Sequence, residues 1–277
     1  MTPAGHAVHG QGVAPSGWLL LVPVAVAAGY LWLAHARRHD ARRWDVRRTL
    51  AFLAGCLALA FGLTPAWLPY PTGDFREHML GHLLVAMLAP LGLVLGAPVT
   101  LLLRSVPAWA GRRIGRVLNS APVHVLAHPV TALVLSVGGM VVLYTTGLYA
   151  LTTVHPPLHH GVHAHFLVSG CLFAWAIAGP DPAPRRPSVP ARLVVLGVAI
   201  TVHAVLSQLI YAGVAVDLPV PPEQRRGGAE LMYYGGDIAE LLLAFALVTT
   251  WRRTPARGDG RRAATVYPAS TSGTAEP

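Results

Sequence analysis

The chain of 277 residues is strongly apolar, because 53% of its residues are hydrophobic and only 12% are charged. A soluble globular protein carries about 25% charged residues, so this composition excludes a soluble protein with a polar surface. All 21 basic residues are arginine, the formal net charge is +9, and we do not expect nucleic acid as a partner. Cys56 and Cys171 lie in apolar segments without a CxxC pair, which argues against a disulfide framework or a zinc ribbon.

Seven apolar segments are long enough to cross a bilayer, since a spanning helix needs about 20 apolar residues. The sequence therefore predicts an all-α fold, a polytopic membrane bundle of seven transmembrane helices. The third segment contains Pro90 and Pro98, so we expect it to bend at a proline or to stop near Gly96 and continue at the interface. In chain order the approximate bounds are 18–36, 50–68, 79–103, 130–151, 162–179, 193–214 and 231–251.

Arginine is concentrated on alternate loops of this seven-helix plan. Eighteen of the 21 arginines fall in the first, third and fifth loops and the C-terminal tail, which leaves Arg76, Arg225 and Arg226 on the other side. Because arginine accumulates in cytoplasmic loops, we expect the N-terminus outside and the C-terminus in the cytoplasm. Residues 1–17 then form an extracytoplasmic tail without a basic leader, 18–253 the transmembrane domain, and 254–277 a disordered cytoplasmic tail.

Two pairs of histidines mark the outer ends of the third and fifth predicted helices. His78 and His82 are four residues apart, and His159 and His163 repeat that spacing. Residues four apart share one face of a helix, so the pairs could converge on a single cation. His165 is a weaker candidate because it would point away from His163. Interfacial histidines that only bind loops and headgroups would give the same pattern.

A second candidate site lies deeper in the predicted bundle. His203 is midway along the sixth segment, about 15 Å from its outer end at 1.5 Å per residue. On the seventh segment Glu230, Tyr234, Asp237 and Glu240 are expected to share a face, with Glu240 at the depth of His203. Ionisable groups at this depth cost several kcal/mol unless they pair or face a polar cavity. They indicate either a metal site or a neutral His203 that ties two helices together through a carboxylate.

The residue types favour copper, with zinc left open. Imidazole binds copper, zinc, iron and nickel, whereas thioethers favour cuprous copper. Met79 adjoins His78 and lies near the face of His82, so it is a further candidate ligand. Met87 is expected to face another way and to pack in the core.

The segment His78-Met-Leu-Gly-His82, followed by Met87, Ala89-Pro90 and Leu95-Gly-Ala-Pro98, resembles the CtaG family of cytochrome c oxidase assembly proteins, which is linked to caa-type oxidases. In order and spacing the similarity continues through His128-Pro129, Leu143-Tyr144, Leu148-Tyr149, His159, His163-Ala-His165-Phe166, Phe173-Ala-Trp175, the segment 179–188 and His203. The double glycine Gly235-Gly236 departs from the pattern, because Asp237 follows it where we would expect a tryptophan.

The resemblance implies a multi-pass protein of a bacterial plasma membrane that helps to build cytochrome c oxidase, contacts oxidase subunits and is not an enzyme. The arginines on the expected cytoplasmic side also indicate contact with membrane lipid. The resemblance also implies delivery of copper to the oxidase metal centres. We therefore expect copper to bind at the outer histidines and to pass inwards or directly to a docked oxidase subunit. The matching histidines are His78, His82, His159, His163, His165 and His203, and the inner candidates also include Asp237 and Glu240.

Three other functions fit parts of the pattern. Histidines on neighbouring helices can ligate haem iron, although their crowding at the outer edge suits a large flat cofactor poorly. A metal-dependent hydrolase would use Glu240 or Asp237 as a base, but the sequence has no HExxH motif. A metal-free scaffold would bind oxidase subunits, and its polar groups would only lock helices together.

Overall fold

The computed structural model describes residues 17–37, 44–183 and 186–249, and in these residues every regular element is a helix. The expected all-α fold is therefore confirmed. The C-terminal tail predicted at 254–277 and all but the last residue of the N-terminal tail predicted at 1–17 lie outside the described residues.

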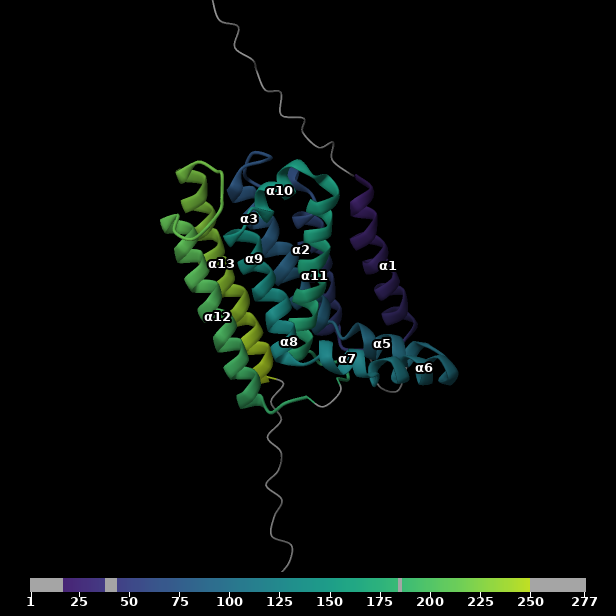
Figure 1. Cartoon of the computed structure of the whole chain (residues 1–277). Coiled ribbons are helices and arrows are strands. Elements are labelled where there is room, and N and C mark those ends of the chain that lie inside the picture. The colour runs from purple at the N-terminus through teal and green to yellow at the C-terminus, as the bar shows by residue number, and fades with distance from the viewer. Residues whose placement is uncertain (1–16, 38–43, 184–185, 250–277) are drawn as a thin grey trace, which may run out of the picture.

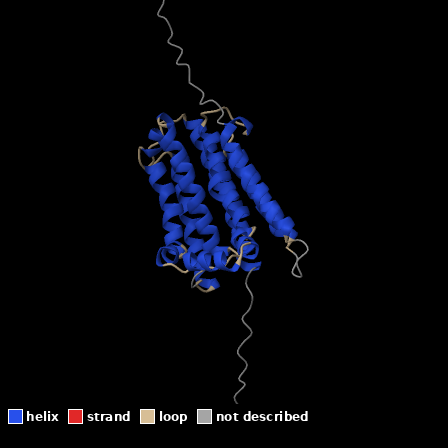
Figure 2. Ribbon diagram, turned by 90° about the vertical axis from the view of Figure 1, so that its right-hand side faces the viewer, coloured by secondary structure: helices blue, strands red, loops and turns tan. Residues whose placement is uncertain are grey.

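The long helices run side by side, and Figures 1 and 2 show this arrangement from two directions. Two of the elements, η3 and η4, are single π-helical turns within longer helices. In chain order the elements are η1 (Gly17–Leu20), α1 (Leu21–Ala36), α2 (Val46–Gly62), η2 (Pro65–Trp67), α3 (Phe75–Leu83), η3 (Leu84–Leu88), α4 (Ala89–Leu95), α5 (Pro98–Ser105), α6 (Ala108–Leu118), α7 (Ala121–Leu126), α8 (Pro129–Leu133), η4 (Val134–Gly138), α9 (Gly139–Thr145), α10 (Leu148–Val154), α11 (Pro156–Ala178), α12 (Val189–Ala212) and α13 (Pro222–Thr249).

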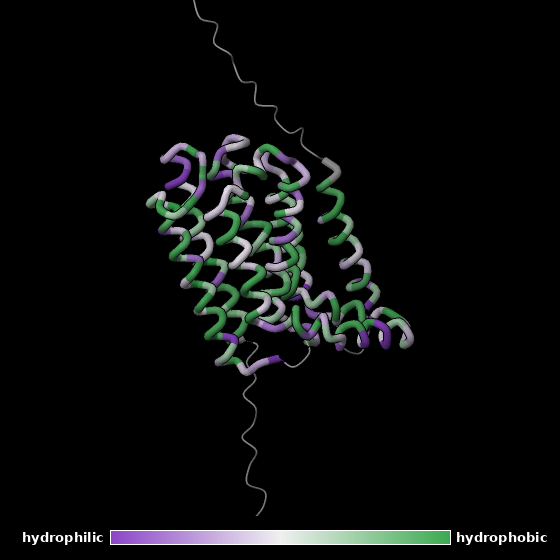
Figure 3. Tube along the Cα trace, in the orientation of Figure 1, coloured by the Kyte–Doolittle hydropathy of each residue, from purple (hydrophilic) through white to green (hydrophobic). Residues whose placement is uncertain are grey.

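Four helical segments of the described chain are long and apolar enough to cross a membrane, and a bent pair of helices raises the number to five. The four are Phe75–Ser105, Pro156–Ala178, Val189–Ala212 and Pro222–Thr249, and the bent pair is Pro129–Thr145 with Leu148–Val154. The remaining two expected spans correspond to α1, with 16 residues, and α2, with 17. Hydrophobic residues dominate the middle of the long helices, and polar residues gather towards their ends (Figure 3).

Two of the expected helices are interrupted. The third ends at Leu95, Ala97 adopts a left-handed conformation with φ 51°, and a new helix begins at Pro98. Proline suits this position because the first helical residue needs no hydrogen-bond donor. The sequence offered a stop near Gly96 as one alternative, and the chain breaks there.

The expectation of one continuous helix over 130–151 is wrong, because α9 and α10 are bent by 80° relative to each other. At the bend Thr146 is extended, with φ −124° and ψ 170°, which ends α9. The hydroxyl of Thr146 then accepts a hydrogen bond from the backbone N–H of Leu148 at 3.3 Å, at the point where α10 begins.

Close contacts between backbones fix the segment formed by η3 and α4 between α2 and α11. A methyl group on Gly55 of α2 would lie 2.5 Å from the backbone nitrogen of Leu93, and one on Gly92 would lie 2.6 Å from the carbonyl oxygen of Ala51. A methyl group on Gly170 of α11 would overlap the carbonyl of Ala86. Small residues allow this approach, and the packing brings α3 and its histidines next to α11.

Candidate metal site

The structure brings the two histidine pairs together at one end of the bundle. His78 and His82 lie on α3, and His159 and His163 lie on the first turns of α11. The ring centre of His78 lies 6.5 Å from that of His82, 6.5 Å from that of His159 and 6.4 Å from that of His163. The rings of His159 and His163 are 4.3 Å apart. We call these four residues the histidine cluster.

The rings of the histidine cluster lie close together, but the three separations from His78 are wider than a shared cation requires. Two imidazoles on one tetrahedral ion have ring centres roughly 5 Å apart, since each metal–nitrogen bond is about 2 Å long. The Nε2 atom of His163 is buried and has no hydrogen-bond partner within the described chain. Among the described residues, no group of three or more His, Cys, Asp or Glu side chains is arranged so that it could hold a metal ion. The cluster is therefore a convergence of rings that must rotate to close around an ion.

Aromatic side chains and Met79 form the inner wall of the cluster. The hydroxyl of Tyr144 lies 3.3 Å from Nε2 of His78 and donates a hydrogen bond to the Met79 sulfur at 3.6 Å. The ring of Tyr149 is 5.0 Å from that of His78. Met79 and Tyr144 are fully buried. Because the Tyr144 hydroxyl contacts both His78 and the Met79 sulfur, the thioether named as a candidate ligand lies beside the cluster.

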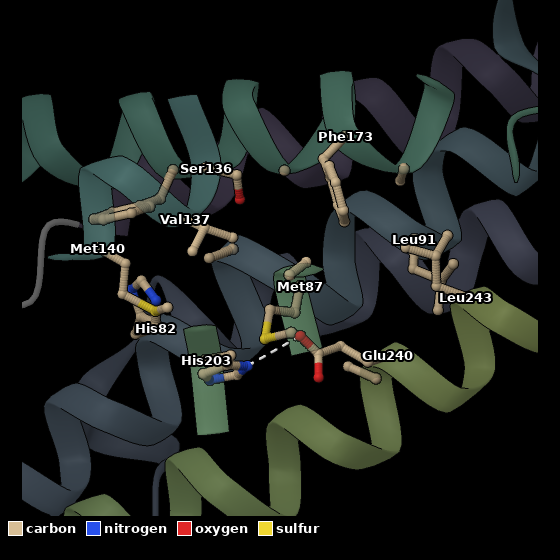
Figure 4. A pocket seen from close by; sticks show the side chains of 16 residues that line it. His82, Met87, Leu91, Ser136, Val137, Met140, Phe173, His203, Glu240 and Leu243 are labelled. Carbon is tan, nitrogen blue, oxygen red and sulfur yellow. Dashed lines mark hydrogen bonds and ion pairs between the residues drawn. The ribbon is translucent and has the colours of Figure 1, made fainter. Parts of the chain in front are cut away.

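A cavity of about 60 Å³ begins where the histidine cluster ends. His82 lines it together with His203 and Glu240, as the close-up in Figure 4 shows. His203 is 4% exposed and Glu240 is 5% exposed. Nδ1 of His203 lies 3.2 Å from Oε1 of Glu240, so the two side chains are paired across α12 and α13. This pair is compatible with both interpretations of His203, a metal site or a contact that ties two helices together through a carboxylate.

Met87 lines the same cavity and is a residue that the sequence interpretation missed. The expectation that it faces away from the histidines assumed regular α-helical periodicity. Met87 lies in the π turn η3, and a π turn inserts an extra residue into the helix. This shift brings Met87 onto the side of the helix that carries His82. No feature of the sequence marks the π turn in advance.

The acidic residues of α13 do not share one face as expected. Glu240 points into the cavity, whereas Asp237 is half-buried and does not line the cavity. Glu230 and Tyr234 are exposed. The deviation follows from geometry, because at about 100° per residue the seven-residue step leaves about 20° and the three-residue step about 60°, so Glu230 and Glu240 lie about 80° apart around the helix. Only one carboxylate therefore reaches His203.

His165 lies away from the histidine cluster. Its ring is exposed, and Nε2 lies 3.0 Å from the carbonyl oxygen of Leu135 in the π turn η4. Since a carbonyl can only accept, the His165 ring donates this hydrogen bond. The atom is thus engaged by the backbone of a neighbouring helix.

An ion pair lies at the start of α3, beside the cluster. Asp74 caps the helix by accepting a hydrogen bond from the backbone N–H of Arg76 at 2.8 Å, and its carboxylate lies 2.6 Å from the Arg76 guanidinium. The hydrogen bonds from Arg76 hold the pKa of Asp74 below its usual value. The cap fixes the first turn of the helix that carries His78 and His82.

The described residues thus define a helical protein with four or five segments that could span a membrane and a cluster of histidine side chains at one end. Residues 28–254 match the family model described as cytochrome c oxidase caa3 assembly factor. The chain therefore belongs to this family of assembly factors, as the resemblance of its motifs predicted.

Similar proteins occur in mycobacteria. The chain is 34% identical over 254 residues to an uncharacterised protein of Mycobacterium bovis and to one of Mycobacterium tuberculosis, and 31% identical over 256 residues to one of Mycobacterium leprae. Each alignment covers 84% of this chain but 38% of the relative, so the chain spans about two fifths of their length. No solved structure matches the chain. The apolar helices and these relatives indicate a bacterial membrane protein.

Proposed function

We propose that this protein binds copper at the histidine cluster and supplies it to the metal centres of cytochrome c oxidase during assembly. One observation carries the proposal: in a member of an oxidase assembly family, His78, His82, His159 and His163 converge from two helices. The orphaned Nε2 atom of His163 supports it further, since a buried imidazole nitrogen without a partner is available to a ligand. Copper is here a cargo and the protein is not an enzyme.

In this proposal the copper ion moves from the histidine cluster to a second binding site in the inner cavity. His82 belongs to both the cluster and the cavity, so an ion could pass from one to the other without leaving imidazole ligands. Met87 adds a thioether beside His203 and Glu240, and thioethers favour cuprous copper over zinc. Asp237 would be an additional ligand at the edge of this site, and Met79 an additional ligand at the wall of the histidine cluster. His165 is the least favoured ligand because its Nε2 atom is engaged.

The proposal includes a topology. We infer seven transmembrane helices when α1, α2 and the bent unit formed by α8, η4, α9 and α10 are counted with the four long segments. The arginine distribution supports an orientation with the N-terminus outside, the C-terminus in the cytoplasm and the histidine cluster at the outer face of the plasma membrane. Oxidase subunits would then receive copper from the outer side, in contact with membrane lipid.

Metal analysis of the purified protein tests the copper proposal. The wild type should carry copper, and His78→Ala/His82→Ala should carry markedly less, whereas His155→Ala should match the wild type because its exposed side chain lies outside the cluster. If the wild type carries zinc instead of copper, the proposed binding site is supported and the proposed metal is wrong. A wild type without copper or zinc above background would overturn metal delivery and support a metal-free scaffold, and a Soret band would support haem binding.

A second experiment tests the assembly role itself. Cells that lack the protein should lose cytochrome c oxidase activity in low copper, and added copper should restore part of it. Normal oxidase activity in the deletion strain at low copper would remove the assembly role, whatever the metal content of the purified protein.

A further inference from the structure

The loop after α11 belongs to a motif, residues 179–188, that the copper proposal does not use. It leads into α12, and Arg192 lies in the first turn of that helix. Arg192 is only 7% exposed. Its Nη1 atom donates a hydrogen bond to the carbonyl of Ile177 at 2.6 Å, whereas its Nε atom is buried without a hydrogen-bond partner within the described chain. A cationic side chain is thus buried with unused donor capacity.

A second arginine reaches the same end of α11. Nη2 of Arg186 donates to the carbonyl of Asp181 at 3.0 Å and to the carbonyl of Trp175 at 3.5 Å. The charged groups that act on its guanidinium are Arg192 and Asp181. The Nε atom of Arg186 and the indole Nε1 atom of Trp175 are also buried and unpartnered within the described chain. Three N–H groups with no acceptor therefore belong to side chains that lie on the last turn of α11 or donate to its carbonyls.

The local acid does not neutralise these cations. The carboxylate of Asp181 accepts hydrogen bonds from the backbone N–H groups of Val99 and Thr100 and from the Thr100 hydroxyl, at the start of α5. Within the described chain no carboxylate forms a salt bridge with Arg186 or Arg192. The carbonyl end of α11 contributes only about half a negative charge, and the amino end of α5 adds about half a positive one. When the Asp181 carboxylate is counted with the two guanidinium groups and the two helix ends, a surplus of about one positive charge remains.

We propose that Arg186, Arg192 and the indole of Trp175 form a binding site for a phosphate-type anion, carried either by an anionic phospholipid or by free inorganic phosphate. A buried cation without a counter-ion is unfavourable, and an anion that accepts the unused N–H groups removes this penalty. The guanidinium fork matches phosphate oxygens. The site lies at the arginine-rich end of the bundle, where helices α11 and α12 are close to the expected level of lipid headgroups.

The thermal stability of the purified full-length protein tests this site. In nanodiscs, replacing part of the phosphatidylcholine by phosphatidylglycerol should raise the melting temperature of the wild type by several degrees. Arg186→Gln and Arg192→Gln should each lose at least half of this rise. Arg112→Gln should keep it, because Arg112 is an exposed arginine on α6.

A parallel titration with inorganic phosphate in detergent identifies the source of the anion. A rise in melting temperature with phosphate assigns the site to free phosphate, and a rise with phosphatidylglycerol alone assigns it to lipid. If neither ligand raises the melting temperature of the wild type, or if the arginine variants keep the full rise, the proposal is overturned. Where Arg192→Gln does not fold, Trp175→Phe removes one donor while keeping an aromatic ring. Copper content should stay unchanged in all of these variants.

Discussion

The imidazole of His203 rests directly against Gly236 on the neighbouring helix α13. A methyl group on Gly236 would overlap the ring of His203. The adjacent Gly235 likewise faces Leu83 of α3. Gly236 therefore lets α13 approach α12 closely enough for Glu240 to reach His203, and Gly235 lets α13 approach α3.

We expect Gly236→Ala to destabilise the protein by about 1–3 kcal/mol, because the added methyl group overpacks a buried contact. The same change should shift His203 and weaken its pairing with Glu240. Gly197→Ala is the matched control: this helix glycine has open space around it, so alanine should be neutral or stabilising by up to about 1 kcal/mol. Unfolding in detergent measures both, and equal stability of the two variants would contradict the packing argument.

Asp74 should make the stability of the protein depend on acid pH. Its pKa is lowered in the folded state, chiefly by hydrogen bonds from Arg76, so its contribution is complete above the unfolded value of about 3.9 and is lost as pH falls through the lower folded value. The melting temperature of the wild type should therefore drop more steeply below about pH 4 than that of Asp74→Asn. Parallel curves for the two proteins would exclude this role.

Spacing predicted the histidine cluster because α3 and α11 are regular helices at the four positions concerned. For His78 and His82, as for His159 and His163, a separation of four residues means one face. Met87 could not be placed in the same way, because it lies within the π turn η3, which changes the periodicity after His82 without a mark in the sequence. The pairing of His203 with Glu240 could be predicted from the matching depth of the two residues in the membrane.

At the scale of elements, α11 divides its histidines between two neighbours. His163 turns towards α3, whereas His165 turns towards the π turn η4 and binds the Leu135 carbonyl. A hydrogen bond of this kind contributes about 0.5–1.5 kcal/mol. One helix thus combines a candidate ligand with a structural contact two residues away.

This division predicts different results for two alanine variants. His165→Ala should lower stability by about 1 kcal/mol, the value of one lost hydrogen bond, while copper content stays at the wild-type level. His163→Ala should lower copper content instead. Metal analysis and unfolding of both variants test the assignment, and equal loss of copper would return His165 to the ligand set.

Composition predicted where the apolar segments lie but not where their helices break. A window of apolar residues has the same composition whether the helix continues or breaks. The break at Ala97 was therefore only one of two alternatives, and the break at Thr146 could not be predicted. Pro98 signalled the first break because proline favours the start of a helix. Thr146 gave no comparable signal, since threonine occurs in helices and at their ends.

At the scale of the whole molecule, the proposed orientation rests on the arginine distribution and can be tested with reporter fusions. Alkaline phosphatase inserted near residue 218, in the loop between α12 and α13, should be active because that loop is expected outside. A fluorescent protein fused after residue 277 should fluoresce in the cytoplasm. The reverse pattern would invert the molecule and place the histidine cluster on the cytoplasmic side.

The π turn η3 has a consequence for the way this bundle tolerates change in length. It lies between the histidines of α3 and the glycine contact of α4 with α2, and each residue of a helix adds a rotation of about 100°. The extra residue therefore acts as an angular offset that lets both ends meet their partners at once. Deleting a single residue within Leu84–Leu88 would turn one end away from its neighbour, so insertions and deletions should be tolerated in the loops and not here.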